Sequence, residues 1–154
     1  MIKENFLRRI LYIGAGLIIL VAALLILLVI PCIILDKSLT STPVNAVIGT
    51  FLNVILHLLP LYVFREAIIV NKRNGLLKNK NILFIASGIG LLLLGLMLMD
   101  GAIAYMEDGA IVFMGHDNMH LASISMFICA GCDFFAAVIA FTALFLLPKK
   151  TDIK

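Results

Sequence analysis

Three ionisable side chains stand inside long runs of apolar residues, namely His57, Asp100 and Asp133. If these runs cross a lipid bilayer, such groups are costly, so they mark a pathway for protons, ions or ligands, or else a tight pair. His57 and Asp133 each lie near the middle of a run, and their depths agree to within about 5 Å at the rise of a helix. We therefore predict that these two side chains meet near the bilayer midplane, within hydrogen-bonding reach or through one water.

Small and polar residues repeat every four positions around both side chains. One series is Asn45, Gly49, Asn53 and His57, and the other is Ser125, Cys129, Asp133 and Ala137. Because a four-residue repeat falls on one face of a helix, each series predicts a face suited to packing between helices in lipid. Each series runs from one membrane surface to the midplane and then gives way to aliphatic and aromatic residues.

That geometry supports two interpretations of the His57–Asp133 pair. In the first, the pair closes a polar pocket that is open to one surface and serves as a proton, ion or ligand site. The candidate residues of this pocket are His57, Asp133, Asn53, Asp100, Asn45 and Ser125. In the second, the pair is a buried hydrogen bond that fixes the register of two helices. The sequence leaves both interpretations open.

Two cysteines, Cys129 and Cys132, form a C-x-x-C sequence on the last apolar run. In this motif the chain resembles four-helix membrane thiol oxidoreductases such as vitamin K epoxide reductase, which also carry a C-x-x-C on a late helix. The resemblance ends there. Those enzymes have a second cysteine pair in an outer loop, whereas the third cysteine of this chain, Cys32, lies in the first apolar run. A reactive thiolate also needs a positive, polar environment, which Asp133 does not provide. We interpret Cys129 and Cys132 as packing residues, with a redox role as the alternative.

A cluster of candidate metal ligands precedes the last apolar run. Its members are Met114, His116, Asp117, Met119 and His120. His116 and His120 are four residues apart, so one helix face could present both to a shared ion, and the thioethers favour copper(I). Copper or zinc is the cofactor that this cluster would hold, although the sequence requires no cofactor. The alternative is a polar boundary in which Asp117 caps the helix that follows.

The composition identifies the environment of these residues. Of the 154 residues, 63% are hydrophobic and only 14% are charged, whereas soluble domains average about 45–50% apolar and about 25% charged residues. A water-soluble globule could not cover so much apolar side chain. The same composition excludes a disordered chain, a collagen, a disulfide scaffold and a nucleic-acid-binding domain. The chain is therefore predicted to be an integral membrane protein.

Four apolar runs are long enough to cross a bilayer once, at 10–35, 44–64, 82–106 and 119–147. A helix needs about 20 mostly apolar residues to span about 30 Å of hydrocarbon. The runs do not alternate apolar and polar residues, as strands of a membrane barrel do. We predict an all-α, polytopic membrane protein with one domain over 1–154, an antiparallel bundle of four transmembrane helices joined by a basic loop at 65–81. The first run is too long for a cleaved signal peptide.

Lysine and arginine are distributed unevenly between the loops. Eleven of the twelve lie toward the two ends of the chain or in segment 65–81, whereas Lys37 alone accompanies the acidic residues of the other two loops. Short loops rich in Lys and Arg remain in the cytoplasm. Both termini and segment 65–81 are therefore predicted to be cytoplasmic. This places the chain in the cytoplasmic (inner) membrane, in contact with its lipids, and directs both polar series toward the outer surface.

The short loops leave little of the chain outside the bilayer, which favours a non-catalytic protein that acts through helix contacts. It would be an accessory subunit of a membrane complex or a partner-binding protein of the immunity or chaperone kind, bound to another membrane protein. The alternative is a small oligomeric transporter or ligand-binding protein that uses the outward-facing pocket, with a second copy as partner. A redox or metal-binding membrane protein is the third hypothesis. Catalysis is not indicated, because no P-loop, dinucleotide fingerprint, H-E-x-x-H or serine-nucleophile elbow is found.

The charge distribution makes a direct prediction about topology. A reporter that is active only in the cytoplasm should be active when fused after Lys154 or inserted near Asn74, and silent when inserted near Gly109. Reporter activity measured in intact cells distinguishes these positions. Activity at Gly109 would overturn the predicted orientation.

Overall fold

The computed structural model describes residues 2–35, 43–72, 79–111 and 117–146, with side-chain surroundings given for 5–35, 46–70, 79–106 and 120–146. Within these residues the secondary structure is helical and no strand is found. Four helical stretches are long and apolar enough to cross a membrane: Asn5–Leu35, Ala46–Val70, Lys80–Met106 and His120–Leu146. The all-helical architecture with four candidate membrane spans is therefore as predicted, and it is that of a multi-pass membrane protein.

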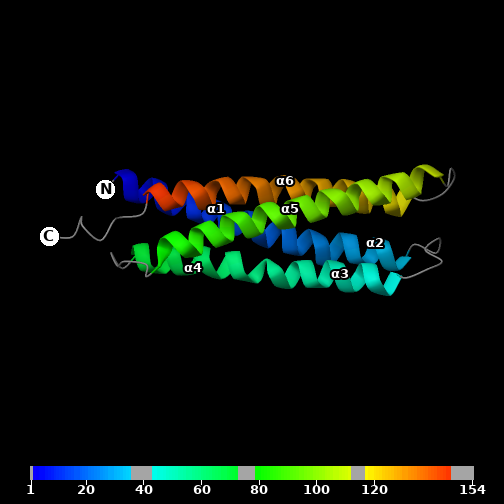
Figure 1. Ribbon diagram of the computed structural model, residues 1–154, viewed down its shortest axis with the longest axis horizontal. Coiled ribbons are helices and arrows are strands. Elements are labelled where there is room, and N and C mark those ends of the chain that lie inside the picture. The colour runs from blue at the N-terminus through cyan, green and yellow to red at the C-terminus, as the bar shows by residue number, and fades with distance from the viewer. Residues whose placement is uncertain (1, 36–42, 73–78, 112–116, 147–154) are drawn as a thin grey trace.

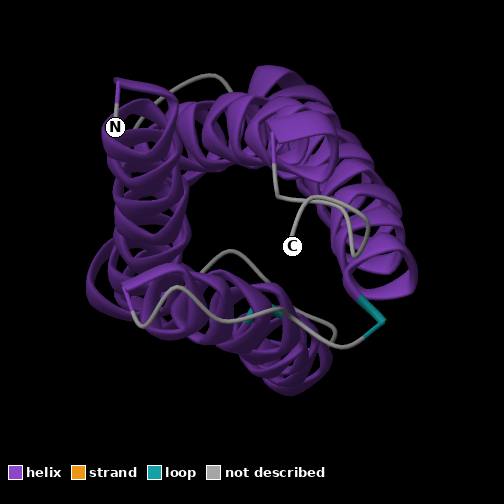
Figure 2. Cartoon of the chain, turned by 90° about the vertical axis from the view of Figure 1, so that its left-hand side faces the viewer, coloured by secondary structure: helices purple, strands orange, loops and turns teal. Residues whose placement is uncertain are grey.

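The first two spans are each built from more than one helical element. The first consists of α1 (Ile2–Leu24), a π-helical turn η1 (Leu25–Val29) and α2 (Ile30–Leu35). The second consists of α3 (Pro43–Leu56) and α4 (Leu58–Lys72). The other two spans are single helices, α5 (Lys80–Ile111) and α6 (Asp117–Leu146). Figure 1 shows them side by side with α1 beginning and α6 ending at the same end, and Figure 2 shows them around a common axis.

The helices extend beyond the apolar runs that predicted them. Helix α4 continues to Lys72, so residues 65–72 of the predicted loop at 65–81 are helical. Likewise α1 begins at Ile2 and α5 continues to Ile111. Polar residues can extend a helix into water, and Gly75 is the first glycine or proline after Pro60. Hydrophobicity therefore located the apolar part of each helix and not the position at which the helix ends.

We call the half of the bundle that contains the start of α1 and the end of α6 the terminal half, and the other half the distal half. In the terminal half, aromatic rings interlock with glycines. Phe64 of α4 lies directly against Gly14 of α1, and its ring meets Phe84 of α5 edge-on, with centroids 6.0 Å apart. The ring of Phe141 on α6 similarly covers Gly88 of α5. These contacts bring all four spans together.

The second span is interrupted at His57, between α3 and α4. Pro60 has no backbone N–H, so the carbonyl of Leu56 loses the partner that a regular helix would give it. The N–H of His57 is shared between the carbonyls of Asn53 and Val54, at 3.2 Å each. A proline causes the break, as it does in most sharply bent helices.

The first span contains a comparable irregularity. The π-helical turn Leu25–Val29 ends two residues before Pro31, and the N–H of Ile30 bonds to the carbonyl of Leu25 five residues earlier. A π turn adds a residue to the helical turn, which relieves the clash between a proline ring and the carbonyl four residues before it. The π turn η1 packs against α3 and α6.

Helices α3 and α5 diverge in the distal half. Helix α5 packs against α4 and then runs obliquely along α6 (Figure 1), whereas α3 packs against α2 and η1 and makes no extended contact with α5. One side of α3 is consequently left without a neighbouring helix. Gly49 on α3 is exposed, and a Cβ added there would meet no atom within 4 Å.

Two glycines on α1 provide a matched test of this packing. A Cβ at Gly14 would overlap the ring of the fully buried Phe64, whereas a Cβ at Gly16 would meet nothing within 4 Å. We expect Gly14→Ala to destabilise the bundle by about 1–3 kcal/mol, because an overpacked core must shift. Gly16→Ala should be neutral or slightly stabilising. Thermal unfolding in detergent micelles compares the two variants, and equal stabilities would contradict the described packing.

Candidate functional site

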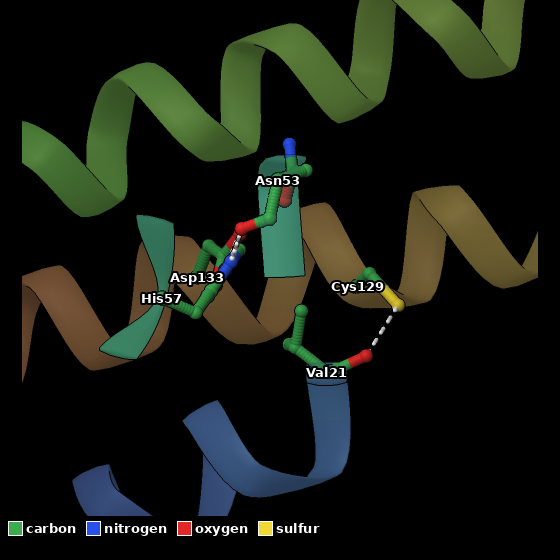
Figure 3. A network of polar contacts seen from close by, with 5 residues as sticks. All are labelled: Val21, Asn53, His57, Cys129 and Asp133. Atoms are coloured by element: carbon green, nitrogen blue, oxygen red, sulfur yellow. Dashed lines mark hydrogen bonds and ion pairs between the residues drawn. The ribbon is translucent and has the colours of Figure 1, made fainter. Parts of the chain in front are cut away.

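His57 and Asp133 are in direct contact in the interior of the bundle. The imidazole Nε2 lies 2.9 Å from Oδ1 and 3.1 Å from Oδ2 of the Asp133 carboxyl (Figure 3). His57 is 1% exposed and Asp133 is 0% exposed, so neither atom group reaches the surface. The predicted contact between these side chains is therefore confirmed, in its direct form.

The other ring nitrogen of His57 determines how many protons the pair holds. Nδ1 lies 2.7 Å from the backbone carbonyl oxygen of Asn53, one turn earlier on α3. A carbonyl oxygen only accepts, so Nδ1 must carry a hydrogen and donate it. One further proton lies between Nε2 and the Asp133 carboxyl. With that proton on either group the pair has no net charge, which allows it to be buried among apolar side chains.

Local sequence features place each member of the pair. Helix α3 ends just before His57. At this point the carbonyl of Asn53 accepts both the backbone N–H and the Nδ1–H of His57. On α6, small residues surround Asp133 and let neighbouring helices approach it closely. These buried residues are Cys129, Ala130, Ala136, Ala137 and Ala140. The carboxyl thus lies on a helix narrow enough to be enclosed by the other spans.

Asn53 joins the site through its backbone but not through its side chain. Its amide points away from the pair and toward α5 (Figure 3). The amide oxygen Oδ1 is buried and has no hydrogen-bond partner in the structure. Ser87 on α5, which the sequence had not singled out, also has a buried hydroxyl without a partner. A single serine next to Gly88 is typical of close helix packing. The local sequence therefore does not indicate that its hydroxyl lacks a hydrogen-bond partner.

The remaining pocket candidates do not join the pair. Ser125 is buried on α6, and its hydroxyl donates to the carbonyl of Leu121 at 2.7 Å, within its own helix. Asp100 is exposed on α5 and takes no part in the contact. The side chain of Asn45 lies outside the described part of α3. The structure therefore brings together His57, Asp133 and the backbone of Asn53, and leaves Asp100 and Ser125 apart from them.

The three cysteines are free thiols. Cys129 is buried, and its Sγ points toward α1, where it lies 4.0 Å from the carbonyl oxygen of Val21 (Figure 3). Cys132 is partly buried and packs against the buried apolar cluster that includes Val21, Leu25 and Cys129. This arrangement agrees with the interpretation of both residues as packing residues.

The predicted metal cluster falls largely outside the described residues. Met114 and His116 are not described, and Asp117 and Met119 are described only as backbone in the first turn of α6. His120 is exposed on α6. Among the side chains that the structure does describe, no group of three or more His, Cys, Asp and Glu residues is arranged to hold a metal ion.

Comparison of the chain with protein-family models gives no match, and comparisons with curated proteins and with solved structures give none either. The geometry of the bundle and of the His57–Asp133 pair is therefore the basis for a functional proposal.

The hydrogen bonds of the pair predict different outcomes for two substitutions of Asp133. Asp133→Asn should fold with near-normal stability, because the amide Nδ2–H can donate to Nε2. Asp133→Leu should destabilise the bundle by about 1–3 kcal/mol, since it leaves a buried ring nitrogen without a partner. Thermal unfolding in detergent compares both variants with the original chain. If Asp133→Leu were as stable as Asp133→Asn, the pair would not hold the spans together.

Proposed function

We propose that this chain is a non-catalytic, multi-pass protein of the cytoplasmic (inner) membrane with both termini in the cytoplasm. It acts through contacts of its helices with another membrane protein, either as an accessory subunit of a membrane complex or as a partner-binding protein. The observation that supports this function best is the unpaired side of α3 in the distal half of the bundle.

In the terminal half of the bundle, each helix lies between two others. In the terminal half, α4 packs between α1 and α5, and α1 packs between α4 and α6. In the distal half, α3 packs against α2 and η1 and has no extended contact with α5. A transmembrane helix from another protein could lie beside α3 in the place that α5 leaves.

Gly49 makes this side of α3 suitable for a helix. It is exposed, and the space that a side chain would occupy there is open. Small residues let two helix backbones approach closely in lipid, where dispersion contacts and interhelical hydrogen bonds drive association. Gly49 belongs to the same four-residue series as Asn53, whose amide points toward α5. The partner helix would therefore lie beside Gly49, the described member of this series that is exposed.

The alternative function, a small oligomeric transporter or ligand-binding protein, is supported by a different observation. A buried amide oxygen without a hydrogen-bond partner, Oδ1 of Asn53, adjoins a buried ionisable pair at the break of a candidate membrane span. Transporters place their binding sites at such interrupted helices near the midplane. In that case Asp133→Asn would fold but lose activity, and the chain would associate with copies of itself.

Two glycine substitutions test the proposed contact. Gly49→Leu and Gly16→Leu both introduce a large side chain where a Cβ meets nothing within 4 Å, so both variants should fold. Because α1 has helices on both sides, only the α3 variant should block a partner. We expect a membrane protein of different sequence to co-purify in mild detergent with the original chain and with Gly16→Leu. Its recovery, measured by quantitative mass spectrometry, should fall at least about tenfold with Gly49→Leu, a loss of about 1.4 kcal/mol.

Two results would contradict this function. One is equal recovery of the same partner with Gly49→Leu and with Gly16→Leu, which would place the contact elsewhere. The other is purification of the chain only with copies of itself, which would favour the transporter or ligand-binding alternative.

A further inference from the structure

We infer that the His57–Asp133 pair is a proton-binding site whose shared proton holds α3 against the rest of the bundle, and that loss of this proton releases α3. This inference goes beyond the proposed function, because it concerns the movement of α3 whether or not a partner is bound. It follows from the hydrogen bonds of His57 and from the place of His57 in the second span.

His57 connects three parts of the bundle. Its Nδ1–H donates to the Asn53 carbonyl at 2.7 Å, which ties the ring to the end of α3. Its Nε2 meets the Asp133 carboxyl of α6 at 2.9 Å and 3.1 Å. Its backbone carbonyl accepts from Leu61 of α4 at 3.2 Å. The imidazole therefore acts as a clamp between α6 and the broken point of the second span.

Gain and loss of a proton affect this clamp differently. When a proton is added, the ring is an imidazolium and the carboxyl is neutral, so Nε2–H still donates to a carboxyl oxygen. When the shared proton is removed, an unprotonated Nε2 faces a carboxylate at 2.9 Å, so two acceptors meet and one carries a full negative charge. No hydrogen bond is then left between the second span and α6 at this point.

The ring could avoid this repulsion by moving its remaining proton from Nδ1 to Nε2. That change restores the bond to Asp133 but removes the donor from the Asn53 carbonyl, and the ring is then no longer tied to α3. In both cases the continuous connection from Asp133 of α6 through the ring to the Asn53 carbonyl of α3 is lost when the shared proton leaves. A rise in pH therefore favours release, since the released state binds one proton fewer.

The fold allows α3 to move when the clamp is lost. Helix α3 ends at Leu56, just before His57, and Pro60 prevents a regular continuation into α4. Its neighbours α2 and η1 belong to the other interrupted span, and α5 makes no extended contact with it. Bending at a helix break needs changes at few residues, as in other hinge motions.

Other titratable groups on the surrounding helices do not replace the pair in this role. Among the described side chains they are Arg8, Arg9, Tyr12 and Cys32 in the first span, Tyr62, Arg65 and Glu66 on α4, Lys80, Asp100 and Tyr105 on α5, and His120, Cys129 and Cys132 on α6. The thiols of Cys129 and Cys132 lie on α6 itself, four residues and one residue before Asp133. Asp100, Tyr12 and Tyr62 are exposed, and Arg65 pairs with Glu66 at 3.2 Å.

The distance between α3 and α5 measures the release. Spin labels are attached at Gly49→Cys and Met97→Cys, two exposed positions, in a chain whose native cysteines are replaced by alanine. The labelled chain is reconstituted in liposomes, and the distance distribution is recorded by pulsed electron resonance from about pH 5 to about pH 10. We expect a short distance at low pH and a longer one at high pH, with their ratio changing about tenfold per pH unit beyond the midpoint.

Two variants separate the proton from the rest of the contact. Asp133→Asn should stay at the short distance at every pH, because its amide donates to Nε2 and has no proton to lose in this range. Asp133→Ala should show the long distance at every pH. A label pair on α5 and α6, at Leu93→Cys and Phe135→Cys, should keep one distance throughout and serves as the control.

Nitrogen NMR of His57 in the same liposomes gives an independent measurement. The Nε2 signal should change over the same pH interval as the α3–α5 distance. A distance that does not change with pH would overturn the inference, and so would an Asp133→Asn chain that responds like the original. If Asp133→Ala does not fold, the pH response of the original chain compared with that of Asp133→Asn still tests the inference. A failed partner experiment with Gly49→Leu leaves these measurements unaffected, so the two proposals can fail separately.

Discussion

The hydrogen bond between His57 and Asp133 is the interaction on which the arrangement of this bundle depends. Neither group can lie among apolar side chains alone, and together they can do so because one shared proton leaves them without net charge. The other ring nitrogen must then find an acceptor, and the nearest is a carbonyl of its own helix. The break before Pro60 in the second span and the small residues of α6 allow these two groups to come into contact.

The sequence predicted the parts of this structure that depend on hydrophobicity and helical repeat. Long apolar runs identified the four spans, and matching depth with a four-residue spacing identified the His57–Asp133 contact. The same rules could not locate the helix ends, because α4 continues through residues 65–72 with no glycine or proline there to stop it. Pro60 and Pro31 indicate that the two helices are irregular near these positions. The form of the irregularity, a break or a π turn, depends on the surrounding carbonyls and side chains.

Other features arise only when the helices are assembled. A repeat shows which face of a helix is polar, but it does not show which helix lies opposite or how far away. The divergence of α3 and α5 is of this kind, and so is the direction of the Asn53 amide. Ser87 was missed for the same reason, since a small residue in an apolar run carries no information about whether its hydroxyl finds a partner. Asp100 illustrates the reverse case. Its carboxyl group made it a candidate for the pocket, but its side chain is exposed.

Helix α5 is longer than a bilayer is thick. Its 32 residues extend for about 48 Å, against about 30 Å of hydrocarbon. A helix with excess length tilts or projects into water, and the oblique course of α5 in Figure 1 is a tilt relative to its neighbours. Because α5 meets α4 at one end and leaves α3 at the other, its tilt sets the separation of α3 and α5. In a bilayer of different thickness, a change in the tilt of α5 would therefore change that separation.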